Sequence, residues 1–410
     1  MRVLFVSDVY FPRVNGVSTS IRTFRGDLAR EGVETILIAP AYPGAAADTE
    51  PGIVRVASGG VPLDPEDRRF HSGALQQVLN AELAAKVDLV HIHTPFIAHY
   101  AAARFARAHR LPLVATYHTF FEDYLLHYVP VLPRRIGRFL ARHFTRSQCD
   151  DVVALISPSA PMREALLAYG VNTPIEVLPT GLPADSYVRG DGARFRQRFD
   201  LPADRPLLLY VGRVAYEKNI DFLLRMFVRL RAQRPDALFV IAGEGPAREH
   251  LARLSRSLGI EDAVHFIGYL DRATELPDCY AAGDAFVFAS RTETQGLVLL
   301  EAMAQGTPVV STAELGTRSI LTPGCGAFVV AEDEGEFSSA VAAALSLPAN
   351  DPRRGQLRVH AESWASQAMA RRLIAFYEKV KGSAALPAQE SNPDNKRGPI
   401  GTPLRAERSS

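Results

Sequence analysis

The sequence predicts an α/β protein in which two doubly wound units are each built on a parallel sheet. Short apolar runs alternate with amphipathic segments along the chain, which is typical of parallel strands joined by helical crossovers. The length of 410 residues is enough for two or three domains. One Gly and two Pro interrupt the alternation in PTGLPADSY, residues 179–187, and favour a linker there. We therefore place the first unit at residues 1–182 and the second at residues 183–362.

The strands are expected where apolar runs are bounded by turn residues. In the first unit these runs are residues 2–7, 34–39, 88–93, 113–117 and 151–156. In the second unit they are residues 207–211, 238–242, 264–267, 285–288 and 308–311. A helix is predicted at residues 363–380. Beyond it, residues 381–410 are rich in Pro, Asn, Ser and charge without an apolar period, so we expect a disordered tail.

Composition narrows the class of protein. A hydrophobic fraction of 47% can build full cores, and a net charge of +1 excludes a dominant nucleic-acid-binding field. The cysteines Cys149, Cys279 and Cys325 are scattered, which favours a reducing compartment and argues against a structural metal. The first strand begins at Arg2, so no signal peptide is expected, and no apolar stretch approaches the length of a membrane span. These features predict a cytoplasmic protein.

Two carboxylates bracket the segment ETQGLVLLE. Glu293 falls in a strand-to-helix loop and Glu301 falls two turns along a helix predicted at residues 297–305. Eight helical residues rise about 12 Å, which is too far for the paired acids of a glycosidase. That spacing suits the two ends of an elongated ligand such as a nucleotide sugar, with Gly296 letting backbone N–H groups approach a diphosphate. The alternative is a solvated loop Glu and an unrelated helix Glu.

A second segment, GRVAYEKN, follows the strand predicted at residues 207–211. It places Arg213 and Lys218 at the carboxyl end of that strand, where open α/β sheets bind ligands. Two cations beside a helix N-terminus suit a diphosphate. Taken singly, either cation is also explained as a solvated loop residue.

In their order and spacing, these two segments resemble the retaining GT-B-fold glycosyltransferases of the E-x7-E family, the glycosyltransferase family 4 type. The resemblance extends to about residue 379 and implies two Rossmann-like domains facing across a cleft. It implies a nucleotide-sugar donor, no cofactor and no metal. By the resemblance, Arg213 and Lys218 hold the donor diphosphate, Glu301 the ribose hydroxyls and Glu293 the donor sugar. The remaining donor contacts that it implies are Gln295, Gly296 and Leu297 for sugar and phosphates and Ile267, Tyr269 and Leu270 for the nucleobase.

The family commonly has an aromatic residue before the glycine of this loop, where the present chain has Gln295. The TETQG form is more similar to the lipid glucosyltransferases and some mannosyltransferases of the family.

The first unit is expected to supply the acceptor side of the cleft. Gly16 opens a helix after the first strand and is able to bring backbone N–H groups to the donor phosphate, although a plain turn also explains it. His118 ends the strand at residues 113–117, and the resemblance places the family's active-site histidine there. Glu122 and Asp123 follow in the same loop as weaker candidates for the acceptor.

Two further patterns resemble a metal site and a dinucleotide-binding turn. His91 and His93 form an H-x-H whose side chains share one side of a strand, but no third metal ligand has sensible spacing. The turn at Gly243 and Gly245 resembles a dinucleotide fingerprint, but its third glycine is replaced by Arg248. Neither a metal site nor a nicotinamide site is expected.

A basic amphipathic helix is predicted after Pro133. Its cations recur at helical spacing at Arg134, Arg135, Arg138, Arg142 and Arg146, among the apolar residues Val129, Val131, Leu132, Ile136, Phe139, Leu140 and Phe144. Such a helix can rest on an anionic membrane surface. The alternative is an ordinary helix with one buried apolar face and one solvated Arg face.

Together these observations predict a peripherally membrane-associated, metal-independent, retaining glycosyltransferase with His118 and Glu293 at its reaction centre. Its donor is expected to be UDP-glucose-like or GDP-mannose, and its acceptor a membrane lipid such as diacylglycerol. The resemblance implies front-face displacement, in which the leaving phosphate takes the acceptor proton. One alternative is a mannosyltransferase acting on a phospholipid or polysaccharide. Another is a non-catalytic nucleotide-sugar or lipid-binding protein, which does not explain the retained carboxylates and cations.

Overall fold

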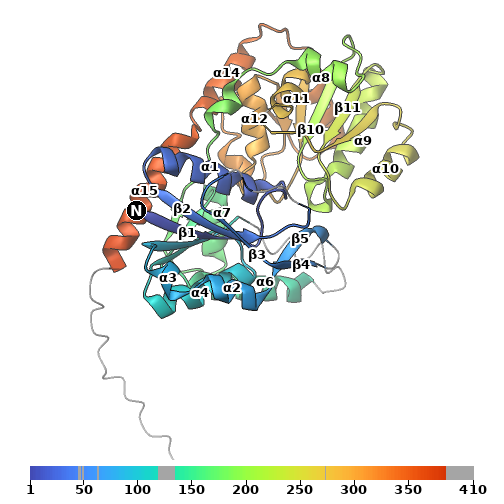
Figure 1. Cartoon of the computed structure of the whole chain (residues 1–410). Coiled ribbons are helices and arrows are strands. Elements are labelled where there is room, and N and C mark those ends of the chain that lie inside the picture. Colours follow the sequence, from blue (N-terminus) through green and yellow to red (C-terminus); the bar gives the residue numbers. More distant parts are fainter. Residues whose placement is uncertain (45–47, 49, 62–63, 119–133, 273, 385–410) are drawn as a thin grey trace, which may run out of the picture.

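The computed structural model describes the chain except residues 45–47, 49, 62–63, 119–133, 273 and 385–410 (Figure 1). Its N-terminal lobe is built on a parallel sheet in the order β3-β2-β1-β6-β7-β8-β9. These strands are β1 (Arg2–Val6), β2 (Glu34–Pro40), β3 (Ile53–Val56), β6 (Leu89–Ile92), β7 (Leu113–Thr116), β8 (Ala154–Ser157) and β9 (Ile175–Val177). The strand order reverses between β1 and β6, which is where doubly wound sheets open a ligand crevice.

The C-terminal lobe is built on a second parallel sheet in the order β12-β11-β10-β13-β14-β15. Its strands are β10 (Leu207–Val211), β11 (Leu238–Ala242), β12 (Val264–Gly268), β13 (Ala285–Phe288), β14 (Val309–Ser311) and β15 (Phe328–Val329). The central strands are buried on both faces, because helices cover both sides of the sheet. The strand order reverses between β10 and β13, so the second sheet also opens a ligand crevice at that point.

Helices connect the strands as crossovers in both lobes. In the N-terminal lobe they are α1 (Gly16–Arg30), α2 (Ser72–Val78), α3 (Ala81–Ala84), α4 (Ile97–His109), α6 (Arg134–Asp150) and α7 (Ala160–Ala168). In the C-terminal lobe they are α8 (Gly192–Arg198), α9 (Ile220–Gln233), α10 (Arg248–Ser257), α11 (Leu276–Ala282), α12 (Leu297–Gln305), α13 (Glu334–Leu345) and α14 (Pro352–Glu362). Three 3₁₀ turns, η1 (Ala184–Tyr187), η2 (Tyr216–Lys218) and η3 (Leu315–Ser319), and an antiparallel hairpin of β4 (Ser58–Val61) and β5 (Asp64–Phe70) complete the described elements.

The last helix, α15 (Ser366–Ala384), returns to the N-terminal lobe and runs beside α1 (Figure 1). Its side chains Leu373 and Tyr377 are fully buried in the same core as Phe5 and Ile21. The helix predicted at residues 363–380 is present, but it begins three residues later and ends four residues later than expected, because residues 363–365 separate α14 from α15. The remainder of the predicted tail, residues 385–410, lies outside the described residues.

The predicted α/β class with two doubly wound units is confirmed, and every predicted strand is present within three residues of its expected bounds. The strands β3, β9 and β15 and the hairpin of β4 and β5 are not predicted by the sequence. Strands β3 and β9 are partly exposed edge or near-edge strands and β15 has two residues, so none of them gives a clear apolar run.

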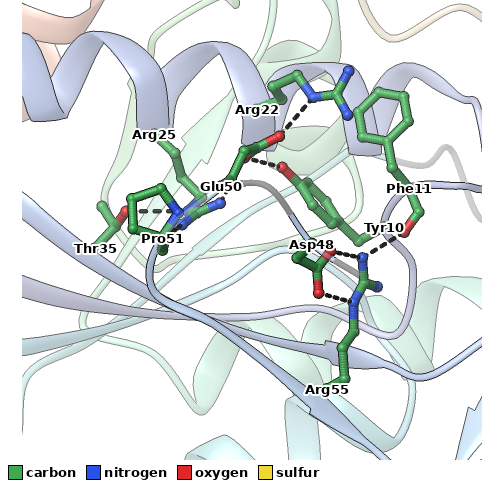
Figure 2. Close-up of polar contacts among 9 residues, drawn as sticks. All are labelled: Tyr10, Phe11, Arg22, Arg25, Thr35, Asp48, Glu50, Pro51 and Arg55. Carbon is green, nitrogen blue, oxygen red and sulfur yellow. Dashed lines mark hydrogen bonds and ion pairs between the residues drawn. The ribbon is translucent and has the colours of Figure 1, made fainter. Parts of the chain in front are cut away.

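A network of charged side chains holds the loop that leads from β1 to α1 (Figure 2). The Glu50 carboxylate accepts hydrogen bonds from Tyr10 Oη at 2.8 Å, Arg25 Nη1 at 2.9 Å and Arg22 Nε at 3.0 Å. Arg55 donates to the Phe11 carbonyl at 2.7 Å and also pairs with Asp48. Burial raises the pKa of Tyr10 to about 12, so its hydroxyl remains a donor. These contacts hold Tyr10 and Phe11, in the first part of the loop that leads to Gly16.

Candidate active site

A cavity of about 760 Å³ lies where the carboxyl ends of strands from both sheets face one another. The N-terminal lobe contributes loops after β1, β6 and β7, and the C-terminal lobe contributes loops after β10, β11 and β13. The cavity brings together most of the residues singled out from the sequence, namely Gly16, His118, Arg213, Lys218, Tyr269, Leu270, Glu293, Gln295, Gly296, Leu297 and Glu301. Ile267 is not among its lining residues and packs against the core instead.

The two predicted cations sit in the loop between β10 and α9. Lys218 Nζ forms an ion pair with the Glu293 carboxylate, so the expected phosphate and sugar ligands are direct neighbours. Arg213 Nη1 lies 3.4 Å from Glu217 Oε1, and the Arg213 carbonyl accepts a hydrogen bond from Tyr210 Oη at 3.0 Å. Each cation is less than one-fifth exposed, which strengthens its electrostatic interaction with any anion in the cavity.

Glu301 lies on the second turn of α12 and is 5% exposed. Its carboxylate pairs with Arg272 and accepts a hydrogen bond from Tyr280 Oη at 2.8 Å. Burial, followed by Glu301 itself, raises the pKa of Tyr280 well above its usual value, so the hydroxyl stays protonated. Carboxylate oxygens accept more than one hydrogen bond each, so Glu301 keeps acceptor capacity for a ligand. The sequence analysis missed Arg272 and Tyr280.

Gly16 is the first residue of α1, whose N-cap is Asn15; the Asn15 side chain accepts from the Ser18 N–H at 2.8 Å. Gly16 does not have a positive φ, and a Cβ built on it meets no atom within 4 Å. Neither a positive φ nor close packing therefore requires glycine at this position. Arg13, in the same loop, is buried, lines the cavity and donates to Tyr269 Oη at 3.4 Å. The sequence analysis did not single it out.

The Gly243 turn has a structural explanation that needs no dinucleotide. Gly243 has φ 137°, and a Cβ on it would lie 2.0 Å from the Gly212 carbonyl oxygen. The glycine therefore permits close packing of the loops after β10 and β11.

The loop before α12 is fastened to the N-terminal lobe. The Gln295 side chain accepts from the Thr180 N–H at 2.8 Å and donates to the Thr180 carbonyl at 2.6 Å. Thr294 Oγ1 donates to the His118 carbonyl at 3.0 Å. Gln295 thus contributes its side chain to the interlobe contact, in addition to any backbone contact with a ligand. This bond pair gives the Gln295 amide a structural role.

Three histidines stack behind the cavity. His91 Nδ1 lies 2.6 Å from Tyr377 Oη and its Nε2 lies 2.7 Å from Thr116 Oγ1. His93 Nδ1 lies 3.3 Å from His118 Nε2. Burial lowers the pKa of His118 to about 4 and lowers the pKa values of His91 and His93 well below their usual value, so all three are neutral at pH 7.

The H-x-H pair is engaged with protein groups. Both ring nitrogens of His91 have hydroxyl partners, and the His91 and His93 rings lie tilted against each other with centroids 4.1 Å apart. Among the described residues, no group of three or more His, Cys, Asp or Glu side chains is placed to hold a metal ion. Glu122 and Asp123 lie outside the described residues.

The basic helix α6 differs from an ordinary surface helix. Arg135, Arg138, Arg142 and Arg146 are exposed, and so are three of its apolar side chains, Ile136 at 50%, Phe139 at 69% and Leu140 at 46%. Its buried positions are instead small or polar: Gly137, Ala141, Thr145, Gln148 and Cys149. The Arg134 side chain and residues Val129, Val131 and Leu132 lie outside the described part. Within the described ranges, no helix is long and apolar enough to cross a bilayer.

Comparison with known proteins assigns the family. Residues 14–186 match the family described as Glycosyltransferase Family 4, and residues 191–364 match Glycosyl transferases group 1. An alpha-monoglucosyldiacylglycerol synthase of Streptococcus pneumoniae is 32% identical over 317 residues, which cover 76% of this chain and 71% of the relative. The chain belongs to the group 1/family 4 glycosyltransferases of the GT-B fold. The resemblance stated from the sequence is thereby confirmed.

Two further similarities support the GT-B assignment. A GDP-mannose-dependent alpha-mannosyltransferase of Mycolicibacterium smegmatis is 29% identical over 394 residues, which cover 95% of this glycosyltransferase and 100% of the relative. The structure of a sucrose-phosphate synthase from Thermosynechococcus elongatus superimposes with a TM-score of 0.75 at 21% identity, covering 93% and 99% of the two chains. The latter shows the shared fold alone.

The buried neutral state of His118 predicts a pH effect on stability. The folded pKa of about 4 lies below the ordinary value of 6.5, so the unfolded chain binds the proton first as pH falls. The contribution of His118 to the free energy of unfolding is therefore fully present above about pH 6.5. It is lost progressively as the pH falls from 6.5 towards 4. Between pH 7.5 and 5.0, wild type is expected to lose about 1–2 kcal/mol more unfolding free energy than His118→Gln.

Urea denaturation of both proteins at the two pH values measures this difference. Burial also raises the pKa of Asp8 to about 6. Asp8 titrates in both proteins, so its contribution cancels in the difference between them. Equal losses in the two proteins would show that His118 is not held neutral by the fold.

Proposed function

We propose that this glycosyltransferase is a retaining, metal-independent hexosyltransferase that moves a sugar from a nucleotide-activated donor to a membrane lipid. The proposal assigns the C-terminal lobe to the donor and the N-terminal lobe to the acceptor. The observation that supports the lipid acceptor is the row of apolar side chains Ile136, Leu140 and Phe144 on α6, which leads from the molecular surface to the cavity.

The donor site follows from the charges around the cavity. Arg213 and Lys218 face the position of a diphosphate, and Arg13 adds a third cation from the opposite lobe. The N-termini of α1 and α12 open towards the same space at Gly16 and Gly296, where backbone N–H groups and helix dipoles favour an anion. These groups together supply the positive charge that a diphosphate leaving group needs.

The resemblance to the family supports the assignment of the remaining donor contacts, whose residues line the cavity. Glu301 accepts hydrogen bonds from ribose hydroxyls and Tyr269 and Leu270 contact the base. Glu293, close to Lys218, accepts from hydroxyls of the donor sugar. In this arrangement Glu293 orients the sugar while Lys218 stabilises charge on the departing phosphate.

The proposed transfer is a front-face displacement. The acceptor hydroxyl attacks the anomeric carbon on the face that the phosphate leaves, and the departing phosphate oxygen takes the hydroxyl proton. The neutral His118 hydrogen-bonds the reacting sugar without exchanging charge. The protein then contributes positioning and electrostatic stabilisation of the leaving group.

The acceptor side is argued from α6 and α4. Ile136, Leu140 and Phe144 are spaced four residues apart, so they share one side of the helix. The first two are about half exposed, and Phe144 lines the cavity. Phe96, the N-cap of α4, and Tyr100 on that helix line the same cavity and are also about half exposed. An acyl chain laid along this row would bring a lipid headgroup to the donor sugar.

The exposed arginines of α6 complement this row. Cations next to apolar side chains on one helix suit a surface of anionic lipid, where each cation contributes about 1 kcal/mol. The name of the Streptococcus pneumoniae relative includes a glycosylated diacylglycerol, which agrees with a lipid acceptor. We accordingly place the enzyme at a membrane surface. Its three free cysteines are buried and compatible with the reducing cytoplasm.

A second candidate is a GDP-mannose-dependent mannosyltransferase acting on a phospholipid or polysaccharide. The observation that favours it is the match along 95% of this chain to a relative of that name. Release of UDP or GDP across a panel of nucleotide sugars, with diacylglycerol vesicles or soluble acceptors, distinguishes the two. Binding of a donor without transfer to any acceptor would instead favour a non-catalytic binding protein.

Replacing each of the two carboxylates by an amide is expected to weaken a different part of ligand binding. Glu301→Gln weakens binding of both the free nucleoside diphosphate and the complete donor by about one to two decades, because it loses a charged hydrogen-bond acceptor at the ribose. Glu293→Gln leaves the free nucleotide bound normally and weakens the steps that involve the sugar. Isothermal titration with both ligands measures this split, and Glu332→Gln, paired with Arg291 outside the cavity, is the matched control. Equal loss of free-nucleotide binding in both variants would contradict the assignment.

The apolar row is tested by vesicle binding. Ile136→Ser with Leu140→Ser is expected to reduce partitioning onto anionic vesicles by at least about tenfold, because about 1 kcal/mol of apolar burial is lost at each site. The matched control is Leu167→Ser with Val359→Ser, which removes two other exposed apolar side chains. Nucleotide binding is unchanged in both proteins. Equal partitioning of the row variant and the control would remove the membrane contact and favour a soluble acceptor.

A further inference from the structure

We propose that His93 is a positioning residue that fixes the tautomer of His118, so that His118 presents its Nδ1–H as a hydrogen-bond donor to the cavity. The inference deepens the proposed function by assigning His118 a donor role towards an oxygen of the sugar or acceptor. It starts from the two ring nitrogens of His93, whose surroundings are different.

The first nitrogen, Nδ1 of His93, lies 3.3 Å from Nε2 of His118. The second, Nε2 of His93, is buried and has no hydrogen-bond partner among the described residues. A neutral imidazole has one N–H group and one lone pair. Since burial keeps both rings neutral, one proton must be assigned to each ring.

Two arrangements satisfy the contact between the rings. In the first, His118 donates from Nε2 to His93 Nδ1, which leaves the His93 proton on Nε2 as a buried donor without an acceptor. In the second, His93 donates from Nδ1 to His118 Nε2, and the orphaned His93 nitrogen has only a lone pair. Buried N–H groups without acceptors are the rarer defect in proteins, so the second arrangement is favoured.

The second arrangement determines the proton on His118. Its Nε2 accepts from His93, so its own proton is on Nδ1. His118 lines the cavity, and Nδ1 is the ring nitrogen that the contact with His93 leaves available. His118 then offers a neutral donor and no lone pair to the ligand, which excludes it as a general base in its resting state. This agrees with the departing phosphate, and not the histidine, receiving the acceptor proton.

His93 is held in place by packing on both sides. Its ring lies 4.5 Å from Phe5 and 4.1 Å from His91, measured between centroids. His91 is in turn held between Thr116 and Tyr377, the latter on α15. Phe5 and His91 thus hold the His93 ring directly, whereas Tyr377 acts one residue further away, on His91.

The tautomer is measured directly by long-range ¹H–¹⁵N correlation on the full chain labelled with ¹⁵N-histidine at pH 7.5. The His118 signals are assigned by their loss in His118→Gln. We expect a protonated Nδ1 and an unprotonated Nε2 for His118 in wild type. A protonated Nε2 in wild type would overturn the inference, whatever the variants do.

Variants of His93 test its causal role. His93→Leu removes the donor that keeps His118 Nε2 unprotonated, so we expect a mixture of the two His118 tautomers and a severalfold fall in turnover. His93→Asn retains an amide N–H near the position of Nδ1 and is expected to restore the wild-type tautomer and most of the activity. Tyr377→Phe is the matched control, because it removes a buried hydrogen bond of His91 without touching the contact between His93 and His118.

The outcomes separate the inference from the proposed function. An unchanged His118 tautomer in a folded His93→Leu protein, or an equal change in Tyr377→Phe, would overturn the positioning role. The expected tautomers without transfer from any nucleotide sugar would leave the inference standing and reject the proposed function. If His93→Leu does not fold, the wild-type spectrum and the His93→Asn spectrum decide the matter.

Discussion

The paired hydrogen bonds between the Gln295 side chain and the Thr180 backbone are the interaction on which the cavity most depends. Each lobe has a core of its own, so contacts between the lobes, including the packing of η3 against α7, set how their strand ends face one another. Gln295 lies in the loop that also holds Glu293 and Gly296, and Thr180 lies at the end of the N-terminal lobe, where its Oγ1 is 2.6 Å from Ser20 Oγ of α1. Tying these segments together, with α15 packed back on the first sheet, brings the cations of one lobe opposite Gly16 and His118 of the other.

The cavity then combines two electrostatic environments. On the C-terminal side, Lys218 and Arg272 pair with Glu293 and Glu301, so the unliganded charges neutralise one another. A donor that brings a diphosphate and hydroxyls can exchange these pairs for its own, which limits the cost of desolvating each charge. On the N-terminal side, burial keeps the histidines neutral, so that wall offers hydrogen bonds without competing for the phosphate.

The sequence predicted those features that depend on local patterns. Buried strands such as β10 and β13 match their expected bounds because apolar runs flanked by turns are local signals. The partners of Glu301 were missed because Arg272 and Tyr280 are 29 and 21 residues away and meet it through the packing of α11 against α12. The amphipathic pattern of α6 was visible, but a pattern does not specify which face is buried. The structure buries small residues and exposes Leu140 and Phe139 instead.

The central claim, retention during metal-independent transfer to a lipid, is tested most directly by the configuration of the product. The enzyme is incubated with nucleotide sugar, diacylglycerol vesicles and excess EDTA, and the anomeric proton of the extracted glycolipid is examined by NMR. The account predicts a glycolipid whose new linkage has the same anomeric configuration as the donor, formed at an undiminished rate. An inverted linkage, or loss of the product on chelation, would contradict it.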